Sequence, residues 1–304
     1  MSQPWSDYMR VGLVHFMAYP AVMGGEGPVL ETIEPLLQDP FFDVLEVTHV
    51  RDDALPEKLA ALFEQAGVEP CFGAQPILLG NKLDLNHSQL EDRGKAVAAV
   101  KRGLDQAARM GCRAASVMSG PVREDKAAAR EQLVESLTEL TAYAKAKGMT
   151  LALETFDQAP FAKNCLIGPT AEAVDVAKLV RGEHPDFGLL LDLSHLPLLN
   201  EESGEALKMA REYLTHAHMG NCAMDDPDHP AYGDNHPRFG APGTRVGVGE
   251  LAKYLQALVD IGYLSRGKRG IVSFEVKPMP GESSEAIIAG SKRALMAAWR
   301  QVNV

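Results

Sequence analysis

Residues 188–195 read GLLLDLSH and contain an apolar run that ends in an aspartate. Three more runs of similar length end in a side chain that can bind a metal ion: LALE at Glu154, THAH at His218 and VSFE at Glu275. Short apolar runs of this kind are typical of strands in a buried parallel sheet. The four runs therefore predict four strands with polar groups at their carboxyl ends.

Outward from these runs, the whole chain alternates short apolar runs with longer segments of helical periodicity. The predicted strands are Arg10–Phe16, Phe42–Thr48, Val68–Phe72, Ala114–Met118, Thr150–Glu154, Gly188–Asp192, Leu214–Met219 and Ile271–Val276. The predicted helices are Val29–Leu37, Leu55–Ala66, Ser88–Met110, Asp125–Lys147, Thr170–Arg181, Glu201–Tyr213, Gly249–Ile261 and Ser284–Val302. This alternation predicts an α/β fold, a (β/α)8 TIM barrel that forms a single domain over residues 1–304.

Two predicted connections are longer than the usual two to six or so residues. They span residues 155–169 and 220–248, and each follows a strand. Both loops should therefore lie at the C-terminal face of the barrel, where barrel enzymes carry their chemistry. The second loop contains NCAMDDPDHPAYGDNHPRFGAPGT, a composition that is typical of an ordered loop with polar side chains.

The four polar strand ends fall on the fifth to eighth predicted strands, which are neighbours in a barrel. Glu154, Asp192, His218 and Glu275 should therefore converge on one point near the barrel axis. Three buried carboxylates would repel one another strongly, and a divalent cation would remove that cost. Carboxylates suit Mg or Mn, and the imidazole favours Mn, Co or Zn, so we expect Mn. The alternative, that each acid caps a helix or pairs with a base, explains four successive strand ends less well.

The motifs LETFD, LDLSH, HMGNC and FEVKP follow the last four predicted strands in this order. In this they resemble the xylose isomerase-like TIM barrel superfamily, the sugar phosphate isomerase/epimerase family, which includes ketose 3-epimerases, inosose dehydratases and apurinic endonucleases. The resemblance covers essentially the whole chain. It implies that Glu154, Asp192, His218 and Glu275 bind the metal and that Glu154 and Glu275 are the catalytic acid and base. Because the superfamily commonly forms dimers or tetramers, it also implies a homodimer or homotetramer.

The chemistry of such a site agrees with that role. A metal that chelates adjacent hydroxyl and carbonyl oxygens acidifies the neighbouring C–H bond and stabilises the enediolate. Return of the proton on the opposite face gives an epimerase, and return at the next carbon gives an isomerase. Loss of a hydroxyl instead gives a lyase or dehydratase acting on a keto-sugar or cyclitol. The sequence predicts a sugar isomerase or epimerase, with the lyase as the first alternative and a hydrolase or a non-catalytic sugar-binding barrel as the others.

Further polar residues surround the predicted centre. By resemblance, His195 contacts the substrate or a further metal, and Asp234 with His236 matches an Asp-x-His pair with which apurinic endonucleases hold an additional zinc. A second metal at His195, Asp234 and His236 is therefore an open alternative to substrate binding by these residues. The histidines that complete the multinuclear zinc site of those nucleases are missing from the other strand ends.

Four more residues are candidates for substrate binding. Arg238 and Lys277 could bind a phosphate, a carboxylate or a hydroxyl, or could simply balance the acids. Lys163 follows the fifth predicted strand, and Glu46 resembles a glutamate often found near the end of the second strand in this superfamily. His216 points the same way as His218 but one layer deeper, where we expect a hydrogen-bonded core histidine.

The bulk properties narrow the class of partner and the compartment. The 30 Lys and Arg against 41 Asp and Glu give a net charge of −11, which disfavours nucleic acid as a partner. The four scattered cysteines suggest a reducing compartment, and neither an export signal nor a membrane span is visible. We therefore expect a cytoplasmic enzyme of carbohydrate metabolism that acts on a small sugar or cyclitol, away from nucleic acid and membranes.

Overall fold

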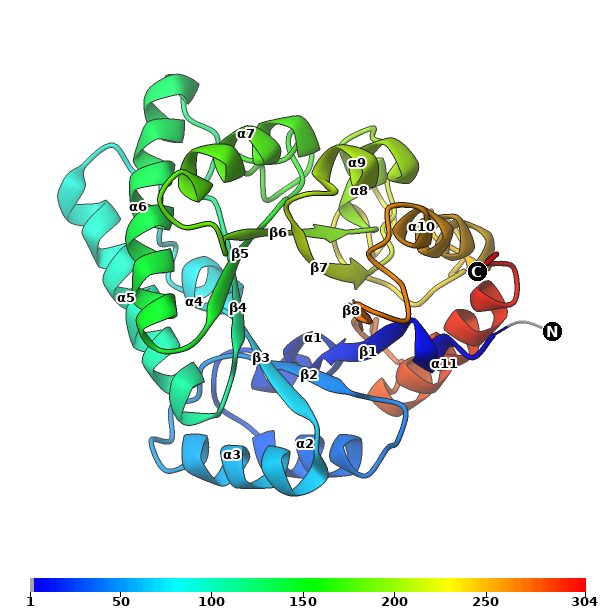
Figure 1. Cartoon of the computed structure of the whole chain (residues 1–304). Coiled ribbons are helices and arrows are strands. Elements are labelled where there is room, and N and C mark those ends of the chain that lie inside the picture. Colours follow the sequence, from blue (N-terminus) through cyan, green and yellow to red (C-terminus); the bar gives the residue numbers. More distant parts are fainter. Residues whose placement is uncertain (1–2) are drawn as a thin grey trace.

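The computed structural model describes residues 3–304, and its strands form a closed parallel barrel in the order β1 to β8 (Figure 1). The strands are β1 (Met9–Val14), β2 (Val44–Val47), β3 (Glu69–Gly73), β4 (Ala114–Met118), β5 (Thr150–Glu154), β6 (Gly188–Asp192), β7 (Leu214–Met219) and β8 (Gly270–Phe274). The predicted (β/α)8 TIM barrel is confirmed. Each predicted strand overlaps the observed one, because a strand buried on both faces is a continuous apolar run in the sequence.

Helices surround the barrel on its outside (Figure 1). The longer ones are α2 (Val29–Leu37), α3 (Leu55–Ala66), α5 (Leu90–Arg109), α6 (Lys126–Ala146), α7 (Thr170–Arg181), α9 (Ser203–Ala210), α10 (Val248–Asp260) and α11 (Ser284–Trp299). The shorter ones are α1 (His15–Ala18), α4 (Gln75–Gly80) and α8 (His195–Leu198), with 3-10 turns η1 (Trp5–Asp7) and η2 (Pro20–Val22). The sequence predicted the longer helices within a few residues at each end, whereas a helix of four to six residues is too short to show a periodicity.

The two sides of each strand have different neighbours. On β6, Leu189 and Leu191 pack into the large hydrophobic cluster that includes the buried faces of the outer helices. On the inward side, the side chains of neighbouring strands have little space. A Cβ atom on Gly12 of β1 would lie 2.2 Å from Oγ of Ser273 on β8. Glycine at this position therefore allows the two strands to pair closely in the barrel interior. Small inward residues leave room for the polar groups above them.

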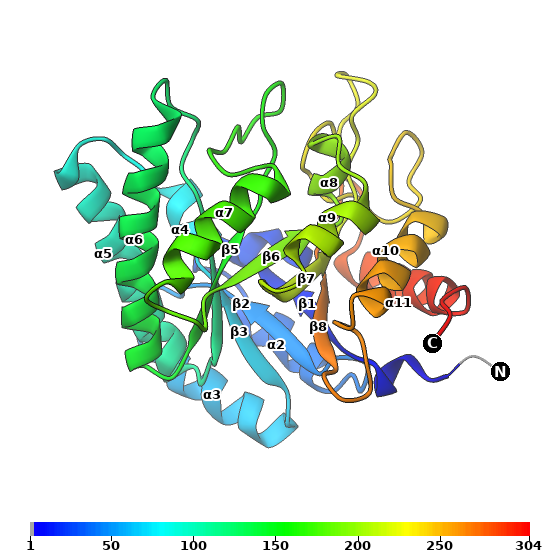
Figure 2. The same cartoon turned by 45° about the horizontal axis from the view of Figure 1, so that its top comes forward.

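The two long loops lie on one side of the barrel, where Figure 2 shows the loop after β5 in green and the loop after β7 in yellow. This is the side at which the strands end, as the sequence predicts. Within residues 3–304, no helix is both long and apolar enough to cross a membrane. The C-terminal ends of the strands are therefore the place where loops and strand-end side chains meet.

Candidate metal centre and active site

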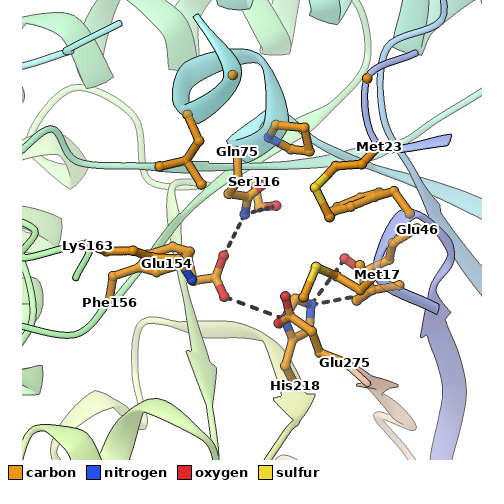
Figure 3. A pocket seen from close by; sticks show the side chains of 16 residues that line it. Met17, Met23, Glu46, Gln75, Ser116, Glu154, Phe156, Lys163, His218 and Glu275 are labelled. Carbon is orange, nitrogen blue, oxygen red and sulfur yellow. Dashed lines mark hydrogen bonds and ion pairs between the residues drawn. The ribbon is translucent and has the colours of Figure 1, made fainter. Parts of the chain in front are cut away.

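Glu154, Asp192, His218 and Glu275 meet at the C-terminal ends of β5 to β8. One ligand atom from each lies within 4.8 Å of the other three, and all four side chains are buried. Nδ1 of His218 is 2.7 Å from Oε2 of Glu275 and 3.5 Å from Oε1 of Glu154 (Figure 3). The structure thus brings together the four residues that the strand ends predict; we refer to them as the primary cluster.

The primary cluster fits a divalent cation. Oε1 of Glu154 and Oδ2 of Asp192 are buried and have no hydrogen-bond partner within residues 3–304. Such unpaired carboxylate oxygens are costly unless a cation binds them. Burial raises the pKa of Asp192, and the Glu275 carboxylate raises it further against the lowering effect of nearby histidines. Three carboxylates and one imidazole form a donor set that suits Mn, Mg or Zn.

Asp192 is held in position by the backbone. Its Oδ1 accepts hydrogen bonds from the N–H groups of Ser194 at 2.7 Å and Gly220 at 3.0 Å, which leaves Oδ2 for a cation. A Cβ atom on Gly220 would lie 2.7 Å from Oδ1 of Asp192 and 2.8 Å from Nδ1 of His236. The glycine of the HMGNC motif is therefore required by the close approach of these two side chains.

Glu46 on β2 lies behind His218. Its Oε1 is 3.0 Å from Nε2 of His218 and 2.8 Å from Nε2 of His216, so both imidazoles can donate to it. Burial would raise the pKa of Glu46, but the two histidines hold it well below its usual range. Glu46 therefore orients His218 with Nδ1 toward the primary cluster. Its side chain also lines the cavity beside this cluster, and His216 is the hydrogen-bonded core histidine that the sequence predicts.

Gln75 is a functional candidate that the sequence analysis did not identify. It is the first residue of α4, and its Nε2 donates to Oε2 of Glu154 at 2.6 Å and to Oγ of Ser116 at 2.8 Å (Figure 3). Gln75 thereby fixes one oxygen of Glu154, and within residues 3–304 the other accepts no hydrogen bond. The signal that could have revealed Gln75 is its place two residues after β3, next to the polar ends of the later strands.

His195, Asp234 and His236 lie next to the primary cluster. Nε2 of His236 is 2.8 Å from Oδ1 of Asp234, and Nε2 of His195 is 3.1 Å from Oδ2 of the same carboxylate. His195, His236 and Asp192 form a second group whose ligand atoms lie within 4.8 Å of one another. Asp192 belongs to both groups. We call His195, His236, Asp192 and Asp234 the secondary cluster.

Lys163 reaches the secondary cluster from the loop after β5. Its Nζ contacts Oδ2 of Asp234, and it lies 4.7 Å from the centroid of the Phe156 ring. Burial would lower the pKa of Lys163, but the Asp234 carboxylate raises it, so the amine stays charged. Burial likewise opposes protonation of His195, and Asp234 raises its pKa to about 10. Asp234 is therefore surrounded by positive groups of the chain itself.

Arg238 and Lys277 do not line the cavity at the primary cluster. The side chain of Arg238 is 45% exposed, and its Nε lies 2.9 Å from Oε1 of Glu282, a carboxylate outside the primary cluster. The backbone N–H of Lys277 donates to the carbonyl of His236 at 2.7 Å. Substrate binding by these two side chains stays a prediction.

A cavity of about 310 Å³ opens beside the primary cluster. Its polar lining comes from Glu46, Gln75, Ser116, Glu154, Lys163, His218 and Glu275. Its apolar lining includes Phe16, Met17, Met23, Pro76, Leu79 and Phe156. Asp192 and the histidines of the secondary cluster are not in this lining, so a substrate in the cavity would meet the primary cluster from the side of Glu154 and Glu275.

Comparison with known proteins supports the resemblance seen in the motifs. The family described as xylose isomerase-like TIM barrel matches residues 31–296. A D-psicose 3-epimerase of Ruminiclostridium cellulolyticum is 31% identical over 139 residues. That stretch is 46% of this chain and 40% of the relative, so the match spans less than half of either protein.

Solved structures are similar over nearly the whole chain. A D-psicose 3-epimerase from Clostridium cellulolyticum H10, solved with D-tagatose, has a TM-score of 0.67 and 22% identity over 96% of both chains. An L-ribulose 3-epimerase has a TM-score of 0.72 and 18% identity, also over 96% of both chains. The IOLI protein, solved with a zinc atom, has a TM-score of 0.72 and 19% identity over 97% of this chain and 100% of its own. At these identities the likeness shows the fold alone.

Proposed function

Because the chain belongs to the xylose isomerase-like TIM barrel family, we propose that it is a divalent-metal-dependent sugar isomerase or epimerase. The observation that carries the proposal is the convergence of four buried ligand groups, two with unpaired oxygens, beside a cavity of about 310 Å³. The names of the similar proteins, 3-epimerases of psicose and ribulose, support the same reaction class.

The residues of the cavity can perform proton transfer next to a carbonyl. When bound at the primary cluster, a divalent ion would acidify the substrate C–H bond through the adjacent oxygens. Glu154 and Glu275 both line the cavity, so one carboxylate can remove the proton while the C–H electron pair moves toward the carbonyl. The other can return a proton to the opposite face or to the next carbon. Gln75 keeps Glu154 in position through its hydrogen bond to Oε2.

We propose one resident metal ion, Mn by preference, because three carboxylates dominate the primary cluster. At the secondary cluster, the Lys163 amine occupies Oδ2 of Asp234 and supplies the positive charge that a second ion would bring. In this proposal His195, Asp234 and His236 stabilise the charge of Asp192 beside the primary cluster, and a second ion at Asp192, His195 and His236 is the alternative that a metal count distinguishes. A cytoplasmic location fits the four free, buried cysteines, and a homodimer or homotetramer remains our expectation.

The test is exchange of a substrate proton with heavy water. Protein depleted of metal and reloaded with Mn is incubated with a panel of ketoses, aldoses and cyclitols, and deuterium incorporation and product mass are measured. We expect metal-dependent exchange that falls by roughly 100-fold or more in Glu154→Gln and in Glu275→Gln. Glu183→Gln, which changes an exposed carboxylate in the turn after α7 and outside the cavity lining, is the matched control. Exchange that survives chelation, or survives both cavity variants, would overturn the proposal, and loss of water from the product would indicate a lyase.

A further inference from the structure

The cavity is polar at its floor and apolar toward its mouth. Glu154 and Glu275 at the floor are 2% and 8% exposed, whereas Leu79 of α4 is 46% exposed. Met17 of α1 and Met23 after η2 are partly exposed, and these residues come from segments that follow β1 and β3. Met17 and Met23 lie across the cavity from Glu154 and Lys163 in Figure 3, and Leu79 of α4 completes this thioether and aliphatic part of the lining.

Positive charge available to a ligand is scarce in this cavity. Within residues 3–304, Lys163 is the one lysine in the lining and no arginine lines it. The Lys163 amine is already engaged by Asp234. Glu46, Glu154 and Glu275 make the remaining charge of the lining negative. A phosphate or carboxylate on the substrate would find no free cationic partner here, although such groups are usually bound by Arg or Lys.

A substrate hydroxyl that contacts Met17, Met23 or Leu79 would also lack a hydrogen-bond partner. The side chains of Met17, Met23 and Leu79 offer no strong hydrogen-bond donor or acceptor. A hydroxyl buried there loses its water without gaining a partner, which is unfavourable. An alkyl or aryl group gains from the same contacts, and methionine adapts its shape to such groups.

We propose that the substrate is an uncharged keto-sugar that carries an apolar substituent, such as an alkyl or aryl aglycone, on the part that faces Met17, Met23 and Leu79. The inference rests on the proposed function for the placement of the sugar ring at the primary cluster. It adds the substrate class: a neutral keto-sugar with an apolar substituent, such as a keto-glycoside, is favoured over a free sugar, and a phosphorylated sugar is disfavoured.

The experiment measures binding separately from turnover. Affinities of the Mn-loaded protein for glucose, glucose 6-phosphate and methyl, butyl and hexyl glucosides are determined by calorimetry. We expect affinity to rise by about threefold to fourfold for each methylene that is buried. Leu79→Asn should reduce this gain. Leu179→Asn on α7, which changes a leucine that is 58% exposed and outside the cavity lining, should retain it.

An affinity that does not depend on chain length would overturn the inference, as would tighter binding of glucose 6-phosphate than of the glucosides. Keto-sugars with and without an alkyl group are then assayed for deuterium exchange, since the glucosides have no carbonyl and serve as binding probes only. Chain-length-dependent binding without exchange in any sugar would uphold the inference and refute the proposed reaction. Exchange in free ketoses without a chain-length effect would do the opposite.

Discussion

Removing the charge of Lys163 should change the number of metal ions that the protein binds. In Lys163→Met, Asp234 keeps its contacts with His195 and His236 but loses its contact with the Lys163 amine. Breaking a buried ion pair in this way should cost the metal-free protein about 3 kcal/mol of unfolding free energy. The secondary cluster can then accept zinc, so the variant should bind two ions per chain where the wild type binds one.

The second ion has a measurable energetic effect. At a free metal concentration 100 times the dissociation constant, each site adds about 2.7 kcal/mol to the free energy of unfolding. The wild type should therefore gain about 2.7 kcal/mol on metal addition and Lys163→Met about 5.4 kcal/mol, if both sites reach that saturation. Urea unfolding of metal-free and zinc-loaded protein gives these values, and elemental analysis after dialysis gives the number of ions.

Two variants control for charge and for position. Lys163→Arg retains a cation and should keep one ion per chain. Lys178→Met removes an exposed lysine of α7 that pairs with Asp175, and it should match the wild type in both assays. Two ions per chain in the wild type, or one ion per chain in Lys163→Met, would refute this role of Lys163.

Two further predictions concern Glu46 and His15. Glu46→Gln should weaken metal binding by roughly 10- to 100-fold in calorimetry, because Glu46 orients His218, and an unchanged affinity would contradict this role. Burial lowers the pKa of His15 to about 3. Below about pH 6.5 the unfolded chain therefore binds a proton at His15, whereas the folded protein keeps this imidazole neutral. This difference does not affect the free energy of unfolding above about pH 7, and it should lower that free energy by about 2 kcal/mol at pH 5. In urea unfolding, His15→Gln should remove that share of the pH dependence. Thr32→Val, which removes only the hydroxyl that lies 2.8 Å from Nε2 of His15 and leaves the imidazole buried, should retain it. Parallel pH curves for wild type and His15→Gln would show the explanation to be wrong.

The sequence predicts most of what depends on local pattern. Each strand is a short apolar run, and each member of the primary cluster directly follows such a run, so order along the chain was enough to bring Glu154 and Glu275 together. Gln75 was missed because α4 has six residues and shows no periodicity. The contact of Lys163 with Asp234 joins residues 71 positions apart in two irregular loops, and no local pattern encodes such a pairing. The contact of Arg238 with Glu282 is also one that no local pattern encodes, and Arg238 does not line the cavity.

The ion pair between Lys163 and Asp234 also determines which segments around the cavity entrance can move to admit a ligand. It fastens the loop after β5 to the loop after β7 at a buried point, so these two loops should open together or not at all. A bulky ligand can then enter only if the short segments after β1 and β3, which carry Met17, Met23 and Leu79, move. Selection of variants for larger or smaller substrates should therefore concentrate on these three side chains and leave the fastened loops intact.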